Sequence, residues 1–314
     1  MPMYRSSLPQ LSKDLFLTDS GLETVLIFQK KIDLPDFASL LLLKDANGRL
    51  VLCDSYRQHV AIAKKNGVGI ILETPTWRAS TDWGVRLNYD LKALDQLNRL
   101  AVKELRKIQK EFDDGITRIV VSGNVGPRGD GYDPDEIMTA AEAEHYHLEQ
   151  IKSLTAAKAD MICAMTLTNE QEAIGLARAA QACNIPVCIS FTVETDGKLP
   201  TGQRLKEAID AVDRATDNGP VYYMINCAHP THFHDVLSTG ENWLNRIQGA
   251  RANASSLSHA ELDEAEDLDD GNPAELGRQV SALKKNLPNL NVIVGCCGTD
   301  HRHIEAMCQS CHGT

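Results

Sequence analysis

Eight short runs of apolar and β-branched residues recur along the chain with helix-like segments between them, and this alternation limits its fold more than any other feature. Glycine, proline or polar residues bound each run, as is typical of buried strands. The predicted strands are Leu15–Asp19, Val68–Glu73, Ile116–Ser122, Asp160–Met165, Val187–Thr192, Val221–Asn226, Ile247–Asn253 and Val292–Gly295. The clearest predicted helices, with leucine and alanine three or four residues apart, are Asp90–Phe112, Asp135–Ala157, Asn169–Ala182, Gln203–Asn218 and Pro273–Asn286.

This pattern predicts an α/β protein with the (β/α)₈ TIM-barrel fold, because eight strand–helix units fit a chain of 314 residues. We expect a single domain over residues 1–314, with its core at about 13–312. A doubly wound open sheet is the alternative. That fold would be favoured by a glycine-rich phosphate loop after the first strand, and Asp19-Ser-Gly-Leu-Glu23 is not such a loop.

Charge and hydropathy exclude two classes of partner. The net charge is −11 and the pI is near 5.4, so we expect no basic stripe and no nucleic-acid partner. No apolar run approaches the roughly 18 residues of a membrane span, and the N-terminal segment lacks the apolar core of a signal peptide. We therefore expect a cytoplasmic protein without membrane association. The sequence contains no indication of its oligomeric state.

Two adjacent cysteines, Cys296 and Cys297, follow the last predicted strand and lie between glycines. A third, Cys227, follows the sixth predicted strand. Because the strand ends of a barrel open onto one cavity, we expect the three sulfur atoms to converge there. Three soft ligands with one open position are typical of a catalytic zinc, since a structural zinc takes four protein ligands.

The other cysteines and the histidines fit different roles. In a reducing compartment, nine cysteines indicate packing, metal-ligand or catalytic thiols rather than a disulfide framework. Cys163 and Cys188 are more typical of core packing. The histidines after the sixth strand fit a solvated helix start better than zinc ligands, and they are His229, His232 and His234. The C-terminal motif of Cys308, Cys311 and His312 matches the sequence pattern of a c-type haem attachment site in its residues only.

One segment is compositionally unusual. Residues 261–270 carry seven carboxylates after the seventh predicted strand. The run lacks the alternating ligands and glycine turn of a calcium loop, so we interpret it as a solvated acidic loop.

Several motifs resemble those of the homocysteine S-methyltransferase family. The most specific is the combination of Gly295-Cys-Cys-Gly-Thr299 with Ile225-Asn-Cys227, which resembles the family's zinc signature. Supporting segments extend the resemblance over residues 13–312, and they are Thr18–Thr24, Glu73–Trp77, Gly123–Pro127 and Ser190–Thr192 with Leu199 and Gly202. The resemblance implies a barrel that depends on Zn²⁺ held by Cys227, Cys296 and Cys297.

The implied activity is S-methyl transfer. Zinc deprotonates a bound thiol, and the resulting thiolate of homocysteine or a related acceptor attacks a methyl group without a general base. By this resemblance we expect the substrate to be bound by Asp19, Gly21, Thr74, Thr76, Met165 and Asn226. For Asp19 a turn-stabilising role is equally compatible with the sequence. For Asn226 we expect its amide to orient a ligand or the substrate.

The sequence departs from the family pattern at two positions near the expected substrate site. Met165 stands where the family has a glutamate that meets the ammonium of homocysteine, and Pro75 stands where many members have asparagine. A buried ammonium needs an acceptor, which a thioether cannot supply. Either another carboxylate, Asp160 or Glu73, takes over the contact, or the true acceptor lacks an ammonium there.

The sequence therefore predicts a zinc-dependent S-methyltransferase with a small-molecule thiol acceptor and a methyl donor. Without a cobalamin or folate module, we expect a small donor such as S-methylmethionine or S-adenosylmethionine. The alternatives are a non-catalytic zinc- or thiol-binding homologue, and a zinc enzyme that acts on a different thiol or by hydrolysis. Hydrolysis would need an activated water and a nearby acid–base group.

Overall fold

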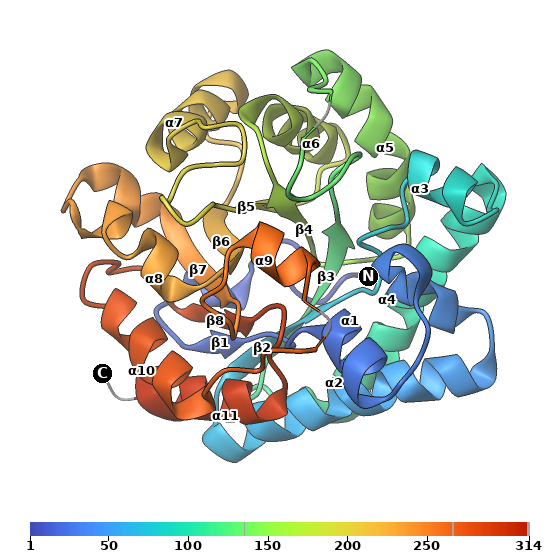
Figure 1. Ribbon diagram of the computed structural model, residues 1–314. Helices are drawn as coiled ribbons and strands as arrows, with labels where there is room; N and C mark the ends of the chain where they lie inside the picture. Colours follow the sequence, from blue (N-terminus) through green and yellow to red (C-terminus); the bar gives the residue numbers. More distant parts are fainter. Residues whose placement is uncertain (135, 266, 313–314) are drawn as a thin grey trace.

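Eight parallel strands close into a barrel in the order β1 to β8 (Figure 1). The computed structural model describes residues 1–134, 136–265 and 267–312. The strands are β1 Phe16–Leu17, β2 Gly69–Glu73, β3 Ile119–Val125, β4 Met161–Leu167, β5 Val187–Phe191, β6 Tyr222–Ala228, β7 Ile247–Ala252 and β8 Val292–Gly295. Each pairs with its neighbours, and β1 pairs with both β2 and β8. This confirms the predicted barrel.

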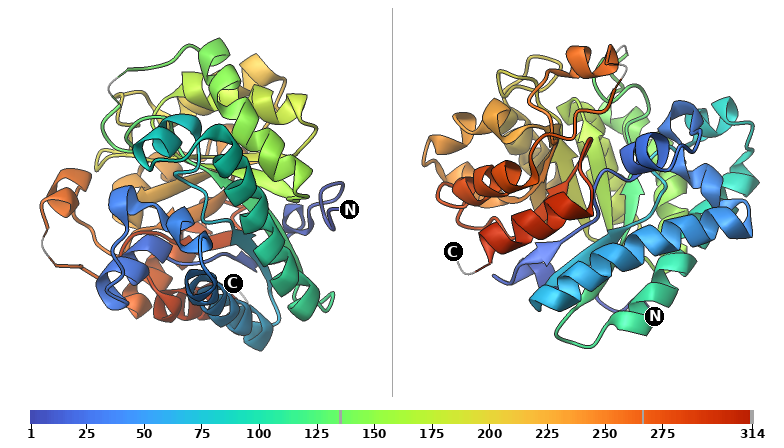
Figure 2. Two further views of the ribbon diagram at one scale, coloured as in Figure 1. Left: turned by 90° about the vertical axis from the view of Figure 1, so that its right-hand side faces the viewer. Right: turned by 60° about the horizontal axis from the view of Figure 1, so that its bottom comes forward.

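Helices surround the barrel (Figures 1 and 2). The α-helices are α1 Leu22–Thr24, α2 Ala46–Asn66, α3 Thr81–Arg86, α4 Leu91–Phe112, α5 Ala140–Ala156, α6 Glu170–Ala182, α7 Leu205–Thr216, α8 Pro230–Phe233, α9 His259–Asp263, α10 Pro273–Leu283 and α11 His301–Cys311. Short 3₁₀ turns occupy Pro9–Leu11, Pro35–Phe37, Ser39–Leu43, Val236–Ser238 and Asn242–Arg246, and one π-turn occupies Val25–Gln29. In the described part of the chain, no helix is long and apolar enough to cross a membrane.

The predicted elements differ from the structure mainly at their ends and at two helices. Strands β3, β4 and β6 extend beyond their predicted last residues, so that Cys227 lies inside β6. The predicted helix start at Asp135 lies outside the described residues, and α5 begins at Ala140 after a Thr139 capping box. The sequence patterns missed α2, whose first turn holds an Asn-Gly pair typical of turns, and α11, which is rich in histidine and cysteine.

The core has two parts because alternate strand residues face opposite sides of the sheet. Inside the barrel, a cluster that we call the lumen cluster contains side chains from seven strands and the N-terminal segment: Leu8, Phe16, Ile71, Val120, Met161, Cys163, Met165, Cys188, Tyr222, Met224, Val292 and Val294. The larger cluster packs the outer barrel face against the helices. The lumen is therefore a packed core, which leaves chemistry to its rim.

The N-terminal segment lies across the end of the barrel where the strands begin. Leu8 packs into the lumen cluster, and the Asn291 side chain donates hydrogen bonds to three carbonyls of the segment, those of Gln10, Ser12 and Asp14. Asp160, which precedes β4, is fully buried there. One of its oxygens accepts from Tyr4 N at 2.9 Å and from Arg106 at 2.9 Å, and the other from Val121 N at 3.0 Å.

We expect Asp160→Ala to destabilise the protein by about 3–5 kcal/mol, because it leaves two backbone amides without their acceptor and removes the buried carboxylate that pairs with the partly buried Arg106. Denaturant unfolding followed by circular dichroism measures this cost. Asp196→Ala is the control, since Asp196 pairs with Lys198 at the surface and its loss should cost no more than about 0.5 kcal/mol. A cost below about 1 kcal/mol for Asp160→Ala would contradict this account.

Candidate functional site

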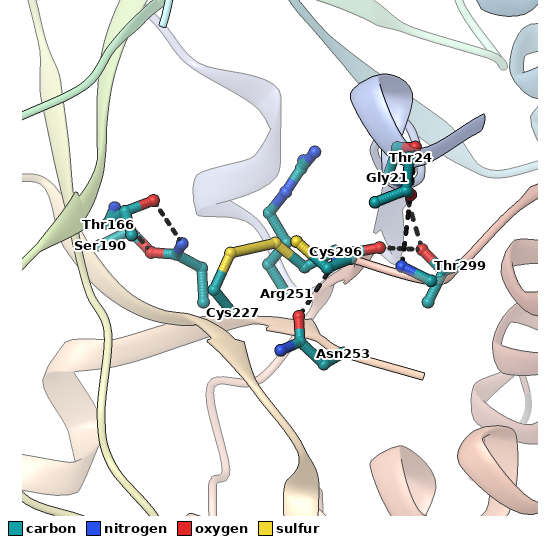
Figure 3. Close-up of a disulfide and its surroundings, with 12 residues drawn as sticks. Gly21, Thr24, Thr166, Ser190, Cys227, Arg251, Asn253, Cys296 and Thr299 are labelled. Carbon is teal, nitrogen blue, oxygen red and sulfur yellow. Dashed lines mark hydrogen bonds between the residues drawn. A yellow bond between two sulfur atoms is a disulfide. The ribbon is translucent and has the colours of Figure 1, made fainter. Parts of the chain in front are cut away.

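Three cysteines meet at the end of the barrel where the strands finish. The sulfur atoms of Cys227, Cys296 and Cys297 all lie within 4.8 Å of one another, and we call them the thiol cluster. Cys227 and Cys296 are joined as a disulfide with Cα atoms 5.5 Å apart (Figure 3). Cys297 is a free thiol. The sequence predicted thiols here. The pairing arises because β6 and the loop after β8 bring these two residues within the Cα separation that a disulfide requires.

The backbone of the Cys296–Cys297 loop is held from both sides. On the β7 side, Cys296 N donates to Ala252 O at 2.7 Å and Cys297 N donates to Asn253 Oδ1 at 3.1 Å. On the β1 side, the Thr299 hydroxyl donates to Cys296 O at 2.6 Å. These bonds fix the direction of both cysteines before any ligand binds (Figure 3).

Gly21 has a structural role beside this loop. Its amide donates to Thr299 Oγ1 at 3.1 Å, and a Cβ at this position would collide with the carbonyl oxygen of Cys296. The sequence predicted that Gly21 contacts substrate. The structure places it against the thiol-cluster loop, where only a residue without a side chain fits.

Asp19, at the end of β1, forms a buried ion pair with Arg251 of β7. Asp19 Oδ1 and Arg251 Nη1 are 2.8 Å apart, and Arg251 also donates to Ser20 O at 3.1 Å. Their side chains are only 5% and 7% exposed. The sequence analysis missed Arg251, although an arginine inside an apolar strand signals a buried partner.

Thr74 and Thr76 join the ends of β2 and β3. Thr76 Oγ1 donates to Asn124 O at 2.7 Å, and Thr74 Oγ1 accepts from Asn124 N at 2.9 Å. The two hydroxyl oxygens are 2.6 Å apart. Both residues are buried near the expected pocket, but their hydrogen bonds serve the strand ends.

Asn226 joins β6 to β4 and β5 in the same way. Its Oδ1 accepts from Thr166 N at 2.9 Å and from Ser190 Oγ at 2.6 Å, and its Nδ2 donates to Thr166 Oγ1 at 2.9 Å. Its amide therefore holds the protein's own groups, and it precedes Cys227, whose φ of 53° lies in the left-handed region. Asn226 thus supports a strained residue of the thiol cluster.

Met165 and Glu73 both face the lumen. Met165 belongs to the lumen cluster and is 3% exposed. Glu73 ends β2 and is equally buried. Burial raises the pKa of Glu73 to about 8, with a further increase from the Asp19 carboxylate. A carboxyl group and a thioether therefore lie in the same lumen below the rim.

Two loops of the rim converge on the thiol cluster through His259 and Tyr132. His259 Nε2 donates to Cys227 O at 2.6 Å, and its Nδ1 lies 3.0 Å from Glu194 Oε1. The Tyr132 ring lies 4.3 Å from the His259 ring, and its hydroxyl contacts the Cys297 thiol. The sequence analysis assigned no role to either residue.

The remaining candidates lie away from the cluster. The described part of the acidic run 261–270 includes the end of α9 and is mostly exposed, and Glu266 lies outside it. Among the described residues, no histidine joins the three cysteines as a potential ligand. His229 caps α8 and is buried rather than solvated, and its Nδ1 lies 2.7 Å from Thr231 Oγ1. In α11, burial raises the pKa of Cys308 to about 12 and that of Cys311 to about 11.

Solved structures of the homocysteine methyltransferase MmuM from Escherichia coli resemble this barrel. The metallated form aligns with a TM-score of 0.73 at 19% identity and covers 94% of this chain and 96% of that chain. The oxidized form aligns with a TM-score of 0.74 at 18% identity and covers 96% and 97%. The apo form has a TM-score of 0.67 at 17% identity. At these identities the likeness shows a shared fold.

The family relationship follows from the sequence match. The model of the homocysteine S-methyltransferase family matches residues 17–311, which is nearly the whole chain. The matched region includes all three residues of the thiol cluster and the strand ends that support them. The chain therefore belongs to the homocysteine S-methyltransferase family of methyltransferase enzymes.

Proposed function

We propose that the protein is a zinc-dependent S-methyltransferase that transfers a methyl group from a small donor to homocysteine or a related thiol. The observation that carries this proposal is the convergence of three cysteine sulfurs within 4.8 Å at the rim of a barrel of this family. One solved relative is a metallated form. Cys227, Cys296 and Cys297 are the residues that would hold the zinc.

The donor set fits this metal. In a tetrahedral zinc site, with Zn–S bonds near 2.3 Å, sulfur atoms lie about 3.8 Å apart, which is within the span of the thiol cluster. Three protein thiolates leave one position for a substrate sulfur, as in catalytic rather than structural zinc sites. The fit requires the reduced protein, because a sulfur in the Cys227–Cys296 disulfide is no longer a thiolate ligand.

When bound, zinc supplies a deprotonated substrate thiol at neutral pH. The protein's own residues position the reacting groups. Asn226 and the loop hydrogen bonds of Cys296 and Cys297 hold the ligands in place. His259 and Tyr132 place two rim loops beside the cluster, where they limit the access of water. Since methyl transfer between sulfur atoms needs alignment and little proton transfer, positioning accounts for most of the protein's task.

A cationic donor of the sulfonium type fits the surroundings of the cluster. The Tyr132 and His259 rings lie at the rim, and the tyrosine ring offers a π-face to a cation. The loop that carries His259 continues into the exposed acidic run 261–270, and the net charge of −11 favours the approach of cations. These features support S-methylmethionine or S-adenosylmethionine as the donor class.

A zinc enzyme that acts on a different thiol is the second candidate. Met165 favours it, because the thioether lies buried in the lumen where the family resemblance implies a glutamate. A non-catalytic thiol-binding homologue would bind metal and thiol without turnover.

We expect reduced protein to contain about one zinc per chain and each of Cys227→Ser, Cys296→Ser and Cys297→Ser to bind zinc roughly 100-fold more weakly or worse, since even partners of metal ligands contribute 10–100-fold. Elemental analysis and competition with a chromophoric chelator measure this. Cys53→Ser is the control, because Cys53 lies in α2 outside the thiol cluster. Oxidised protein should take up zinc only after reduction. Full zinc occupancy in the Cys296→Ser and Cys297→Ser variants, or His229 in the coordination shell, would refute the ligand assignment.

A matrix of donors and thiols tests the activity itself. Zinc-loaded protein is incubated with S-methylmethionine, S-adenosylmethionine or betaine, each combined with homocysteine, cysteine or 4-mercaptobutanoate, and methylated thiol is measured by mass spectrometry. We expect turnover with a sulfonium donor and homocysteine, and none with Cys297→Ser. Turnover with a different thiol alone would support the second candidate. Binding without turnover in every combination would identify a non-catalytic homologue.

A further inference from the structure

Several buried polar atoms in the barrel interior have no hydrogen-bond partner among the described residues. They include Glu73 Oε2, Ser122 Oγ and Thr192 Oγ1. Glu73 is 3% exposed, and the other two side chains are fully buried. Glu73 is two residues beyond Ile71 and Ser122 two beyond Val120, so both share the lumen face with members of the lumen cluster. Buried polar atoms normally have partners, so these atoms retain hydrogen-bonding capacity that a polar ligand group could use.

The position of Glu73 relative to Met165 follows from the strand register. Glu73 pairs with Ser122 of β3, and its carboxyl group lies beside Ser122 and Cys163 of β4. Met165 is two residues beyond Cys163, on the same face and closer to the rim. The Glu73 carboxyl group therefore faces the same lumen as Met165, at the level of Cys163 and one lumen-facing position farther from the rim.

The charges around Glu73 leave it without a cation of its own. Arg251 is the nearby cation, and its hydrogen bonds go to Asp19 Oδ1, Thr18 Oγ1 and Ser20 O. A buried carboxylate is costly unless it is paired, and burial together with Asp19 accordingly raises the pKa of Glu73 to about 8. At neutral pH the Glu73 carboxyl group is therefore mostly protonated, and a cationic group of a ligand bound beside it would favour its ionised form.

Asp160, the other carboxylate near β4, cannot perform this role. It lies where the strands begin, at the opposite end from the thiol cluster, and both of its oxygens accept hydrogen bonds from Tyr4, Arg106 and Val121. Glu73 is the carboxylate that combines burial, an unpartnered oxygen and a place in the lumen.

We propose that Glu73 binds the ammonium group of the amino-acid thiol, the contact that the family resemblance assigns to a glutamate at the position of Met165. This inference rests on the proposed function, because it assumes an amino-acid thiol at the thiol cluster. Ser122 lies beside Glu73 in the register and contacts its carboxyl group, so its hydroxyl borders the same head group. The carboxylate that binds the ammonium group is thereby supplied by β2 instead of β4.

The test compares two thiols that differ only in the amino group. Calorimetry on reduced, zinc-loaded protein gives the dissociation constants of homocysteine and of 4-mercaptobutanoate. We expect wild-type protein to prefer homocysteine at least tenfold. Glu73→Gln should weaken homocysteine binding at least tenfold and change 4-mercaptobutanoate binding less than twofold. Zinc content, measured in parallel, should stay at the wild-type value.

A rescue variant separates recognition of the ammonium from a structural role. In the double variant Glu73→Gln, Met165→Glu the carboxylate returns to the family position, and the preference for homocysteine should return with it. Glu172→Gln is the control, because Glu172 is a buried carboxylate that bonds His147 and Arg128 outside the lumen. The Glu172→Gln variant should prefer homocysteine over 4-mercaptobutanoate by the same factor as the wild type.

Three results would overturn the inference. They are equal affinity of wild-type protein for both thiols, equal weakening of both by Glu73→Gln, and an unchanged preference in Glu73→Gln. The first needs no variant and therefore stands even if a substitution impairs folding. If neither thiol binds to zinc-loaded wild-type protein, the proposed function fails and the inference fails with it. That result is distinct from binding without preference, which overturns the role of Glu73 alone.

Discussion

The closure of the barrel through β1 is the constraint on which the site depends. β1 has only two residues, Phe16 and Leu17, yet it pairs with β2 on one side and β8 on the other. So short a ladder provides few hydrogen bonds. Two further connections hold β1 in place, the Asn291 side chain at its start and the buried Asp19–Arg251 ion pair at its end. Without this closure, the loop after β8 would lose the Thr299–Gly21 bond that supports Cys296.

Polar side chains at the strand ends mainly connect strands to one another. Thr74 and Thr76 connect β2 to β3, and Asn226 connects β6 to β4 and β5. Such networks are strong in a buried setting because every member is satisfied. A rim built this way holds the thiol cluster rigidly, and among the described residues it leaves only a few polar atoms without a partner. Glu73 differs from these connecting side chains, because its Oε2 has no hydrogen-bond partner.

The strands and the thiol cluster were predictable because their signals are local. Runs such as Val187–Phe191 are buried on both faces and therefore apolar throughout, and cysteines at strand ends must converge in a closed barrel. The contacts of Arg251 and His259 were not predictable, because they join residues 232 and 32 positions apart whose meeting depends on the closed sheet and on loop paths. Helix α2 was missed because its first turn holds Asn47 and Gly48, a pair more typical of turns.

The hydrogen bond from His259 to the carbonyl of Cys227 has a consequence for access to the site. The same side chain anchors the segment after β7 and supports the backbone of Cys227, a member of the thiol cluster. Admission of a substrate by displacement of this loop would remove that support at the same moment. The position of this loop and the orientation of Cys227 are thus coupled, because the hydrogen bond from His259 fixes both.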